Sequence, residues 1–385
     1  MIQRVTEHAA VRSQSAQAPR WFSPAAPAIA GPPPSAGPPP SAVPRPALSD
    51  PAPEPAPGWI PASAQAQEIP PDAPLDASAF APEQMLRQRA QPPQAGWRRA
   101  VFLLSGGRVQ PKPSAREIAR DHLIAAVRTP VRGSRRIAVI SRKGGVGKTT
   151  TTLMLGHTLA QWRGDRVVAL DGNPDAGSLG YRVRRETSAT LTDLLKDASK
   201  IVSYSQIRDY TSQASTRLEV VASDDDAQIT QAMGEQELID AVRLLDQHYN
   251  LVLLDTGTGI LDRATQGILR MTDQIVIVTM PSLDGARAAS LTLDWLEHNG
   301  YGRLVRGAVA VLNQNRDQTI VDVERVEDHF GRRCRSTVLL PYDPHLQAGA
   351  ESELDHLAEA TRDAYLHLAA EVADGFREPY ETGHG

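Results

Sequence analysis

The sequence KGGVGKTT at residues 143–150 decides the fold class of this chain. It follows the apolar run Ile137–Ile140 and precedes Thr149–Arg163, a stretch long enough for a helix. A strand, a glycine-rich loop and a helix in this order predict a phosphate-binding loop, because glycines let backbone N–H groups approach an anion and the helix N-terminus adds partial positive charge. In such a loop Lys148 contacts the β and γ phosphates and the Thr149 hydroxyl ligates Mg²⁺.

The loop departs from the general pattern G-x-x-x-x-G-K-[ST] in two ways. Arg142 stands where the pattern has its first glycine, and a second lysine, Lys143, precedes the two glycines. The residues that we expect to contact a bound nucleotide in this stretch are Lys143, Gly144, Gly145, Val146, Gly147, Lys148, Thr149 and Thr150.

Seven short apolar runs follow one another along the chain. Most are separated by stretches long enough for a crossover helix, such as Thr149–Arg163 and Ala286–Asn299. Unbroken apolar runs are typical of strands buried on both faces of a parallel sheet. We therefore predict an α/β fold with a doubly wound, mostly parallel sheet of about seven to eight strands, whose ligands bind beyond the carboxyl ends of the strands. The runs are Ile137–Ile140, Val167–Leu170, Leu218–Ala222, Leu251–Leu254, Ile275–Thr279, Ala308–Leu312 and Thr337–Leu340.

The composition divides the chain into four parts. Residues 1–95 hold 22 of the 30 prolines and few branched apolar residues, which predicts a disordered tail rich in Pro and Ala. Residues 96–134 are a bridge, with a predicted strand at Trp97–Leu104 and a helix that begins at the capping-box pair Ser114 and Glu117. We assign residues 135–378 to the nucleotide-binding domain and residues 379–385 to a flexible C-terminus.

Charge and cysteine content exclude several classes of protein. The net charge is −4, which provides no general basic field for nucleic acid. The single cysteine, Cys334, rules out a disulfide framework and fits a reducing compartment. The N-terminus lacks an apolar signal-peptide core, and no apolar run is long enough to span a membrane. We therefore expect a cytoplasmic protein without direct membrane insertion.

Acidic residues follow two of the apolar runs directly. Asp171 comes after Val167–Leu170 and Asp255 after Leu251–Leu254. A carboxylate at a strand end next to a phosphate loop can hold Mg²⁺, so we assign metal binding to Thr149 and Asp255. The glycines Gly257 and Gly259 let the loop after Asp255 respond to a γ-phosphate.

KGGVGKTT resembles the deviant Walker A motif of the MinD/ParA family of P-loop NTPases. The resemblance covers residues 135–378 and implies an ATPase that forms a homodimer around ATP and Mg²⁺. It also implies that Lys143 reaches the nucleotide of the partner subunit, like an arginine finger supplied in trans. Near the base, it implies contacts from Asn313 and from Pro341 and Asp343.

The resemblance also implies catalytic roles for Lys143, Lys148 and Asp171. The family has two aspartates two positions apart after the second strand, and the second helps to position the attacking water. Here Asp171 matches the first aspartate, but the second position is Asn173, which cannot act as a base. We therefore expect slow hydrolysis, with Asp171 or Asp175 taking the role, or an ATP-binding module with negligible turnover.

A narrower resemblance extends to residue 97. Gly96-Trp97-Arg98-Arg99, Thr129-Pro130 and Asp171-x-Asn173-Pro174-Asp175 are similar to the EspI-like ATPases of type VII (ESX) secretion in actinobacteria, which also carry Pro/Ala-rich tails. This resemblance implies a protein partner in the secretion machinery.

A partition ATPase of the ParA type, which binds DNA nonspecifically as a dimer, is the alternative. Arg132, Arg135 and Arg136 are the candidate DNA contacts, and ATP-dependent DNA affinity that falls steeply with salt would support it. Membrane binding in the manner of MinD is set aside, because residues 355–385 carry seven acidic residues against Arg362 and Arg377.

Overall fold

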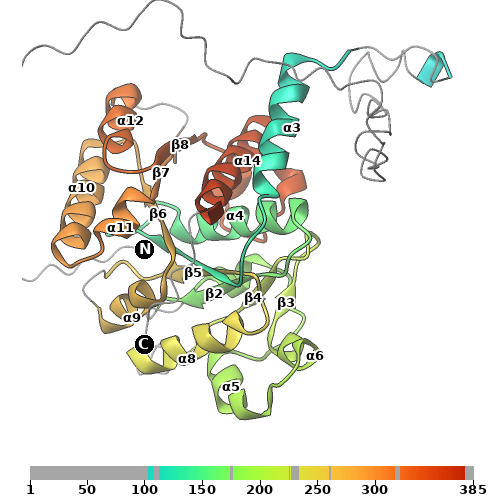
Figure 1. Cartoon of the computed structure of the whole chain (residues 1–385), viewed down its shortest axis with the longest axis vertical. Helices are drawn as coiled ribbons and strands as arrows, with labels where there is room; N and C mark the ends of the chain where they lie inside the picture. Colours follow the sequence, from blue (N-terminus) through green and yellow to red (C-terminus); the bar gives the residue numbers. More distant parts are fainter. Residues whose placement is uncertain are drawn as a thin grey trace, which may run out of the picture. The chain divides into compact units, whose positions relative to one another are not determined.

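The computed structural model describes residues 103–106, 112–173, 177–224, 226, 234–259, 262–316 and 321–377. The predicted tail 1–95 and C-terminus 379–385 lie outside these residues. An eight-stranded sheet with the order β3-β4-β2-β5-β1-β6-β7-β8 forms the centre of the described part (Figure 1). The strands are β1 (Arg135–Ile140), β2 (Val167–Gly172), β3 (Ser212–Gln213), β4 (Glu219–Val221), β5 (Leu251–Thr256), β6 (Gln274–Thr279), β7 (Val309–Asn313) and β8 (Ser336–Leu340).

Every neighbouring pair of strands is parallel except β3 and β4, which are antiparallel. The seven predicted strands are confirmed. The short β3 was not predicted, because two residues at a sheet edge leave no apolar run in the sequence. The prediction of a mostly parallel sheet is therefore correct.

The two faces of the sheet pack into separate cores. In β1, Ile137 and Val139 point into one core, whereas Ala138 and Ile140 point into the other. This alternation follows from the period of two along a strand, and it explains why the runs carry apolar residues at every position. The described chain is thus doubly wound, as predicted.

Helices cover both faces of the sheet (Figure 1). One face is covered by α4 (Lys148–Trp162) and α14 (Glu359–Asp374), and their buried side chains share a core with Ile137 and Val139. The other face carries α5 (Leu191–Lys196), α8 (Glu235–Asp246), α9 (Arg263–Met271), α10 (Leu283–His298), α11 (Gly302–Arg306) and α12 (Val323–Gly331). Short helices α6 (Tyr204–Ile207) and α13 (Pro344–Gln347) lie in the connections.

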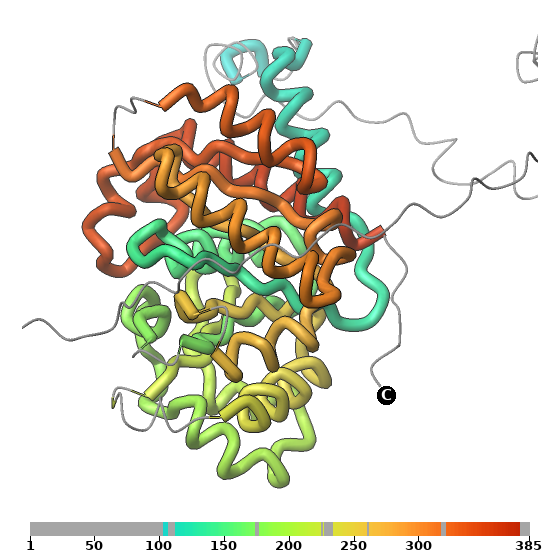
Figure 2. Tube along the Cα trace, turned by 90° about the vertical axis from the view of Figure 1, so that its left-hand side faces the viewer, coloured from blue at the N-terminus to red at the C-terminus, as the bar shows by residue number. Residues whose placement is uncertain are grey.

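The helix predicted in the bridge is present as α3 (Ala115–Val127). Its capping box forms as expected, because Glu117 N donates to Ser114 Oγ at 3.1 Å and Ser114 N donates to the Glu117 carboxylate at 2.6 Å. The helix packs against α14 and α4 (Figures 1 and 2). The strand predicted at Trp97–Leu104 is wrong at Leu103 and Leu104, its two described residues. These residues lie in a helical turn, in which Gly106 N donates a hydrogen bond to Leu103 O.

C-terminal helix α14 is a core element. Tyr365, Leu366 and Leu368 are among its buried side chains, so its apolar residues face the protein. Among the described residues, no helix is both long enough and apolar enough to cross a membrane.

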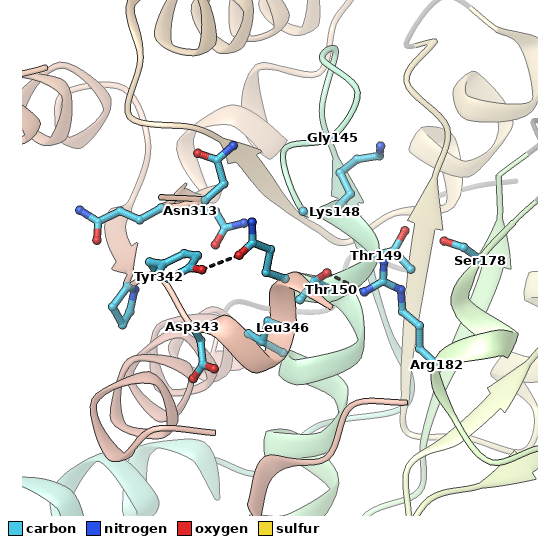
Figure 3. Close-up of a pocket in the computed structure, with 15 residues that line it drawn as sticks. Gly145, Lys148, Thr149, Thr150, Ser178, Arg182, Asn313, Tyr342, Asp343 and Leu346 are labelled. Atoms are coloured by element: carbon cyan, nitrogen blue, oxygen red, sulfur yellow. Dashed lines mark hydrogen bonds between the residues drawn. The ribbon is translucent and has the colours of Figure 1, made fainter. Parts of the chain in front are cut away.

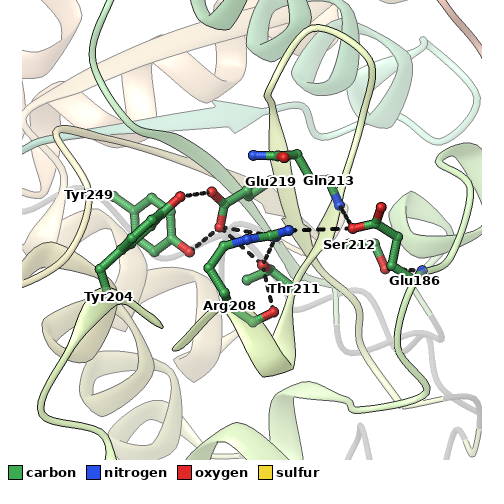
Figure 4. A network of polar contacts seen from close by, with 8 residues as sticks. All are labelled: Glu186, Tyr204, Arg208, Thr211, Ser212, Gln213, Glu219 and Tyr249. Atoms are coloured by element: carbon green, nitrogen blue, oxygen red, sulfur yellow. Dashed lines mark hydrogen bonds and ion pairs between the residues drawn. The ribbon is translucent and has the colours of Figure 1, made fainter. Parts of the chain in front are cut away.

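A buried carboxylate holds the β3–β4 edge of the sheet. Glu219 of β4 is 1 % exposed and accepts hydrogen bonds from the hydroxyls of Tyr204, Tyr249 and, at 3.0 Å, Thr211 (Figure 4). The Arg208 guanidinium lies 3.6 Å from Glu219 Oε2. Burial beside Glu219 raises the pKa of Tyr204 to about 12, so this hydroxyl stays a donor at neutral pH.

Replacing Glu219 with alanine should destabilise the fold by about 2 to 3 kcal/mol, because buried donors lose their acceptor and Arg208 loses its buried partner. Urea unfolding monitored by circular dichroism measures this change. Glu186→Ala is the matched control, since Glu186 contacts the same Arg208 at 3.4 Å from an exposed position and should cost about 1 kcal/mol or less. Equal losses in the two variants would contradict a special role for the buried carboxylate.

Candidate nucleotide site

The glycine-rich loop joins β1 to α4 in the predicted geometry. β1 ends at Ile140 and α4 begins at Lys148, with Gly147 as its N-cap residue. Gly145 and Gly147 have φ angles of +72° and +92°, which residues with a Cβ rarely adopt. Val146 between them is buried with its side chain in the core, so only its backbone can serve a ligand. The loop therefore presents backbone groups at the N-terminus of a helix.

A cavity of about 460 Å³ opens beside this loop (Figure 3). The loop and the first turn of α4 form one wall, and the segments after β7 and β8 form the opposite wall. Its lining residues are Gly145, Gly147, Lys148, Thr149, Thr150, Ser178, Arg182, Asn313, Gln314, Asn315, Pro341, Tyr342, Asp343, Leu346 and Gln347. The cavity lies at the carboxyl ends of the strands, where the sequence placed it.

Asn313 ties β7 to the phosphate loop. Its Nδ2 donates to Val146 O at 2.8 Å, and a Cβ on Gly147 would lie only 2.2 Å from this nitrogen. The Asn313 amide therefore fixes the backbone of the loop. Asn313 also lies on the wall of the cavity, and the family resemblance implies that it contacts the base. A contact with the base stays a prediction.

Pro341 and Asp343 also line the cavity, but the Asp343 carboxylate is engaged elsewhere. It is 5 % exposed, and its oxygens accept from His345 N and Ala358 N, both at 3.0 Å. This aspartate caps α13 and anchors the start of α14. The adjacent Tyr342 and Gln347, which the sequence analysis did not assign to the site, are linked by a hydrogen bond at the cavity wall (Figure 3).

Two carboxylates lie next to each other beneath the loop. Asp171 and Asp255 are paired in the register of β2 and β5, and each is 1 % exposed. Asp171 accepts from Leu179 N at 2.9 Å and from Asn173 N at 3.3 Å. Burial, together with the neighbouring Asp255 charge, raises the pKa of Asp171 to about 7. Neither residue lines the cavity.

Asp255 is oriented toward the first turn of α4. Thr152 Oγ1 donates to Asp255 Oδ1 at 3.3 Å and also to Lys148 O at 3.1 Å. Burial raises the pKa of Asp255, and the Thr149 hydroxyl and the Lys148 charge oppose this rise. The structure therefore brings Thr149, Lys148 and Asp255 together as predicted.

These residues fit a Mg²⁺–nucleotide. Oxygen donors from Thr149 and Asp255 suit a Mg²⁺ that keeps most of its waters, and two adjacent buried carboxyl groups favour a nearby cation. Lys148 and the backbone of the loop would hold the phosphates, and the ion would neutralise the charge between them.

Lys143 stands apart from the other loop residues. It is half-buried and does not line the cavity, and neither does Gly144, which is exposed. The backbone of Lys143 turns over the hydroxyl of Ser141, which accepts from Lys143 N and donates to Lys143 O, both at 3.2 Å. Pro174 and Asp175 lie outside the described residues.

Ser178 and Arg182 are site residues that the sequence analysis missed. Both line the cavity from the segment after β2, 30 or more residues from the loop. No motif marks them, because this segment consists of short turns without a repeating pattern. Only the tertiary structure places both at the cavity and Arg182 beside Thr150.

Comparison with known proteins gives the family. A family model described as an AAA domain matches residues 134–298. The ESX-1 secretion-associated protein EspI of Mycobacterium tuberculosis is 38 % identical over 286 residues, which are 74 % of this chain and 42 % of EspI. The crystal structure of a ParA family ATPase from Chlorobium tepidum matches with a TM-score of 0.54 at 20 % identity, over 62 % of this chain and 98 % of that one.

This chain is a MinD/ParA-like P-loop protein that resembles EspI. The septum site-determining protein MinD from Pyrococcus horikoshii, solved with Mg-ADP, has the same fold (TM-score 0.51, 21 % identity, 62 % of this chain and 96 % of that one). The sheet and the phosphate loop of this chain thus belong to the part that has the MinD/ParA-like fold. The chain spans 42 % of the length of EspI, so the likeness concerns that part of EspI alone.

Proposed function

We propose that this MinD/ParA-like protein is an ATP-driven molecular switch. It binds ATP with Mg²⁺, dimerises around the nucleotide, hydrolyses ATP slowly, and regulates or organises a protein assembly. The observation that carries the proposal is the phosphate loop with its second lysine, set against a cavity that Lys148, Thr149 and Thr150 line.

The position of Lys143 supports dimerisation. Its side chain does not line the cavity of its own subunit, although its backbone belongs to the loop. A lysine of this loop that does not line the cavity of its own subunit is suited to contact the nucleotide of a second copy. This is the role that the MinD/ParA resemblance implies for the residue.

Slow hydrolysis is supported by the residues at the end of β2 and directly after it. Asn173 occupies the position of the family's second aspartate, and Asp171 is buried with its carboxylate held by two backbone amides. A buried carboxyl whose pKa lies at about 7 is only partly ionised at neutral pH. The protein would then stay in its ATP-bound state for long periods, as a switch requires.

The likeness to EspI supports a partner in a type VII secretion system over DNA. Of the arginines considered for DNA, Arg136 forms a two-armed pair with Asp273, at 2.9 and 3.0 Å. Arg135 is 5 % exposed and donates to Phe376 O at 3.3 Å. These two arginines hold the start of the central strand β1, and only Arg132 of the three is exposed.

Replacing Asn173 with aspartate tests the switch. We expect ATP turnover to rise about 10- to 100-fold, since a positioned carboxylate typically contributes factors of this size or more. Phosphate release is measured on the full chain with ATP and Mg²⁺, and Asn173→Ser is the control that removes the amide without adding charge.

Unchanged turnover in Asn173→Asp would contradict the assignment of slow hydrolysis to this residue. A wild type and variant that bind ATP without releasing phosphate would instead identify an ATP-binding module. A wild type that binds no ATP would overturn the whole proposal.

A further inference from the structure

A second cation lies at the phosphate end of the cavity. Arg182 ends the short 3₁₀ turn η3 (Leu179–Arg182) that follows β2, and it lines the cavity beside the first turn of α4. Its Nη1 donates to Thr150 Oγ1 at 2.9 Å (Figure 3). The guanidinium therefore lies against the same helical turn that carries Lys148 and Thr149.

The guanidinium of Arg182 is incompletely satisfied by the described protein. Its Nε is buried and has no hydrogen-bond partner among the described residues. Burial lowers the pKa of Arg182, and the neighbouring Asp255 carboxylate opposes this fall. Buried donors nearly always have a partner, so this orphaned N–H leaves the guanidinium incompletely paired in the nucleotide-free protein, while the residue itself lines the cavity.

We propose that Arg182 binds a phosphate group of the nucleotide held by its own subunit. The inference rests on the proposed ATP binding. An arginine presents several donors in a planar fork that matches phosphate oxygens, and it remains charged when partly buried. Lys148 and Arg182 then approach the phosphates from two sides, one from the loop and one from the segment after β2.

The contact also links the nucleotide to the acidic positions. Leu179, in the same turn as Arg182, donates its N–H to Asp171 Oδ2 at 2.9 Å. At the other end of the turn, the Arg182 carbonyl accepts from Ser352 N at 3.1 Å. A phosphate held by Arg182 therefore contacts the turn whose first residue, Leu179, holds Asp171.

The test is the affinity of the full chain for ADP and ATP with Mg²⁺, measured by isothermal titration calorimetry. Arg182→Gln removes the charge but keeps a donor for Thr150 Oγ1, and we expect it to weaken both affinities about 10- to 100-fold. Arg182→Lys keeps the charge but loses the planar fork, so it should recover part of this loss. Arg184→Gln is the matched control, because Arg184 is exposed, outside the cavity and two residues away, and it should bind as the wild type does.

Two further readouts separate phosphate binding from a structural role. Without nucleotide, the melting temperatures of the three variants should agree with that of the wild type. The affinity of Arg182→Gln for ADP should also fall less steeply with salt than that of the wild type, because one cation is missing. Wild-type affinity in Arg182→Gln, or equal losses in the Gln and Lys variants, would overturn the inference. A wild type that does not bind ADP or ATP would instead overturn the proposed function.

Discussion

Replacing Lys143 with alanine is expected to lower ATP turnover about 10³-fold while changing the affinity of a single subunit for ATP only a few fold. A cation supplied across a dimer interface stabilises the charge that develops on the transferred phosphoryl group, and contacts of this class contribute about 10³ to 10⁵ in rate. Lys143 does not line the cavity of its own subunit, so its loss leaves the contacts of Lys148 and the loop backbone in place.

Two measurements on the full chain test this expectation. Phosphate release gives the turnover, and light scattering with size-exclusion chromatography gives the mass with and without ATP. Arg142→Ala is the control, because Arg142 is the exposed neighbour in the same loop. If Lys143→Ala hydrolyses ATP and dimerises as the wild type does, the sandwich dimer is wrong for this protein.

The stability of the nucleotide-free protein should fall as pH rises from about 4 to about 7. Burial and the Asp255 charge raise the pKa of Asp171 to about 7 in the folded state, whereas an aspartate in the unfolded chain titrates near 3.9. The folded state therefore holds a proton that the unfolded state loses over this range. The stabilisation that protonated Asp171 provides is complete below about pH 4 and is lost as pH rises through 7.

The size of this effect is on the order of 3 to 4 kcal/mol for so deeply buried a group. Urea unfolding at pH 4 and pH 8, with EDTA to remove divalent cations, measures most of it. Asp171→Asn cannot ionise and should show a much smaller difference between the two pH values, whereas Asp193→Asn, at an exposed helix start, should keep the wild-type difference. An equal pH dependence in Asp171→Asn and the wild type would contradict the raised pKa.

The fold followed from the sequence because its signals are local. Each of the seven apolar runs became a strand, and the capping box at Ser114 and Glu117 began a helix where the pattern placed it. The strand expected at Trp97–Leu104 is wrong at Leu103 and Leu104, since a short apolar run without its neighbours does not distinguish a strand from a helical turn.

Within the site, sequence reasoning found the residues that a motif marks. Lys148, Thr149, Asn313 and Pro341 line the cavity, and their contacts with a nucleotide stay a prediction. Arg135 and Arg136, which are candidate DNA contacts only under the alternative of a partition ATPase, bind partners inside the protein. They do so because they begin a strand of the sheet. A charge cluster in a sequence does not show which of its members have partners elsewhere in the chain.

The sequence by itself determined that this chain carries a phosphate loop between a buried strand and a helix, because glycine spacing and apolar periodicity act over a few residues. Only the tertiary structure decided what surrounds the loop. It placed Asp171 beside Asp255 through the register of two strands, and Arg182 against Thr150 across 32 residues. The tertiary structure also leaves Lys143 out of the lining of the cavity in its own subunit. Such contacts depend on how distant segments pack, which no local pattern encodes.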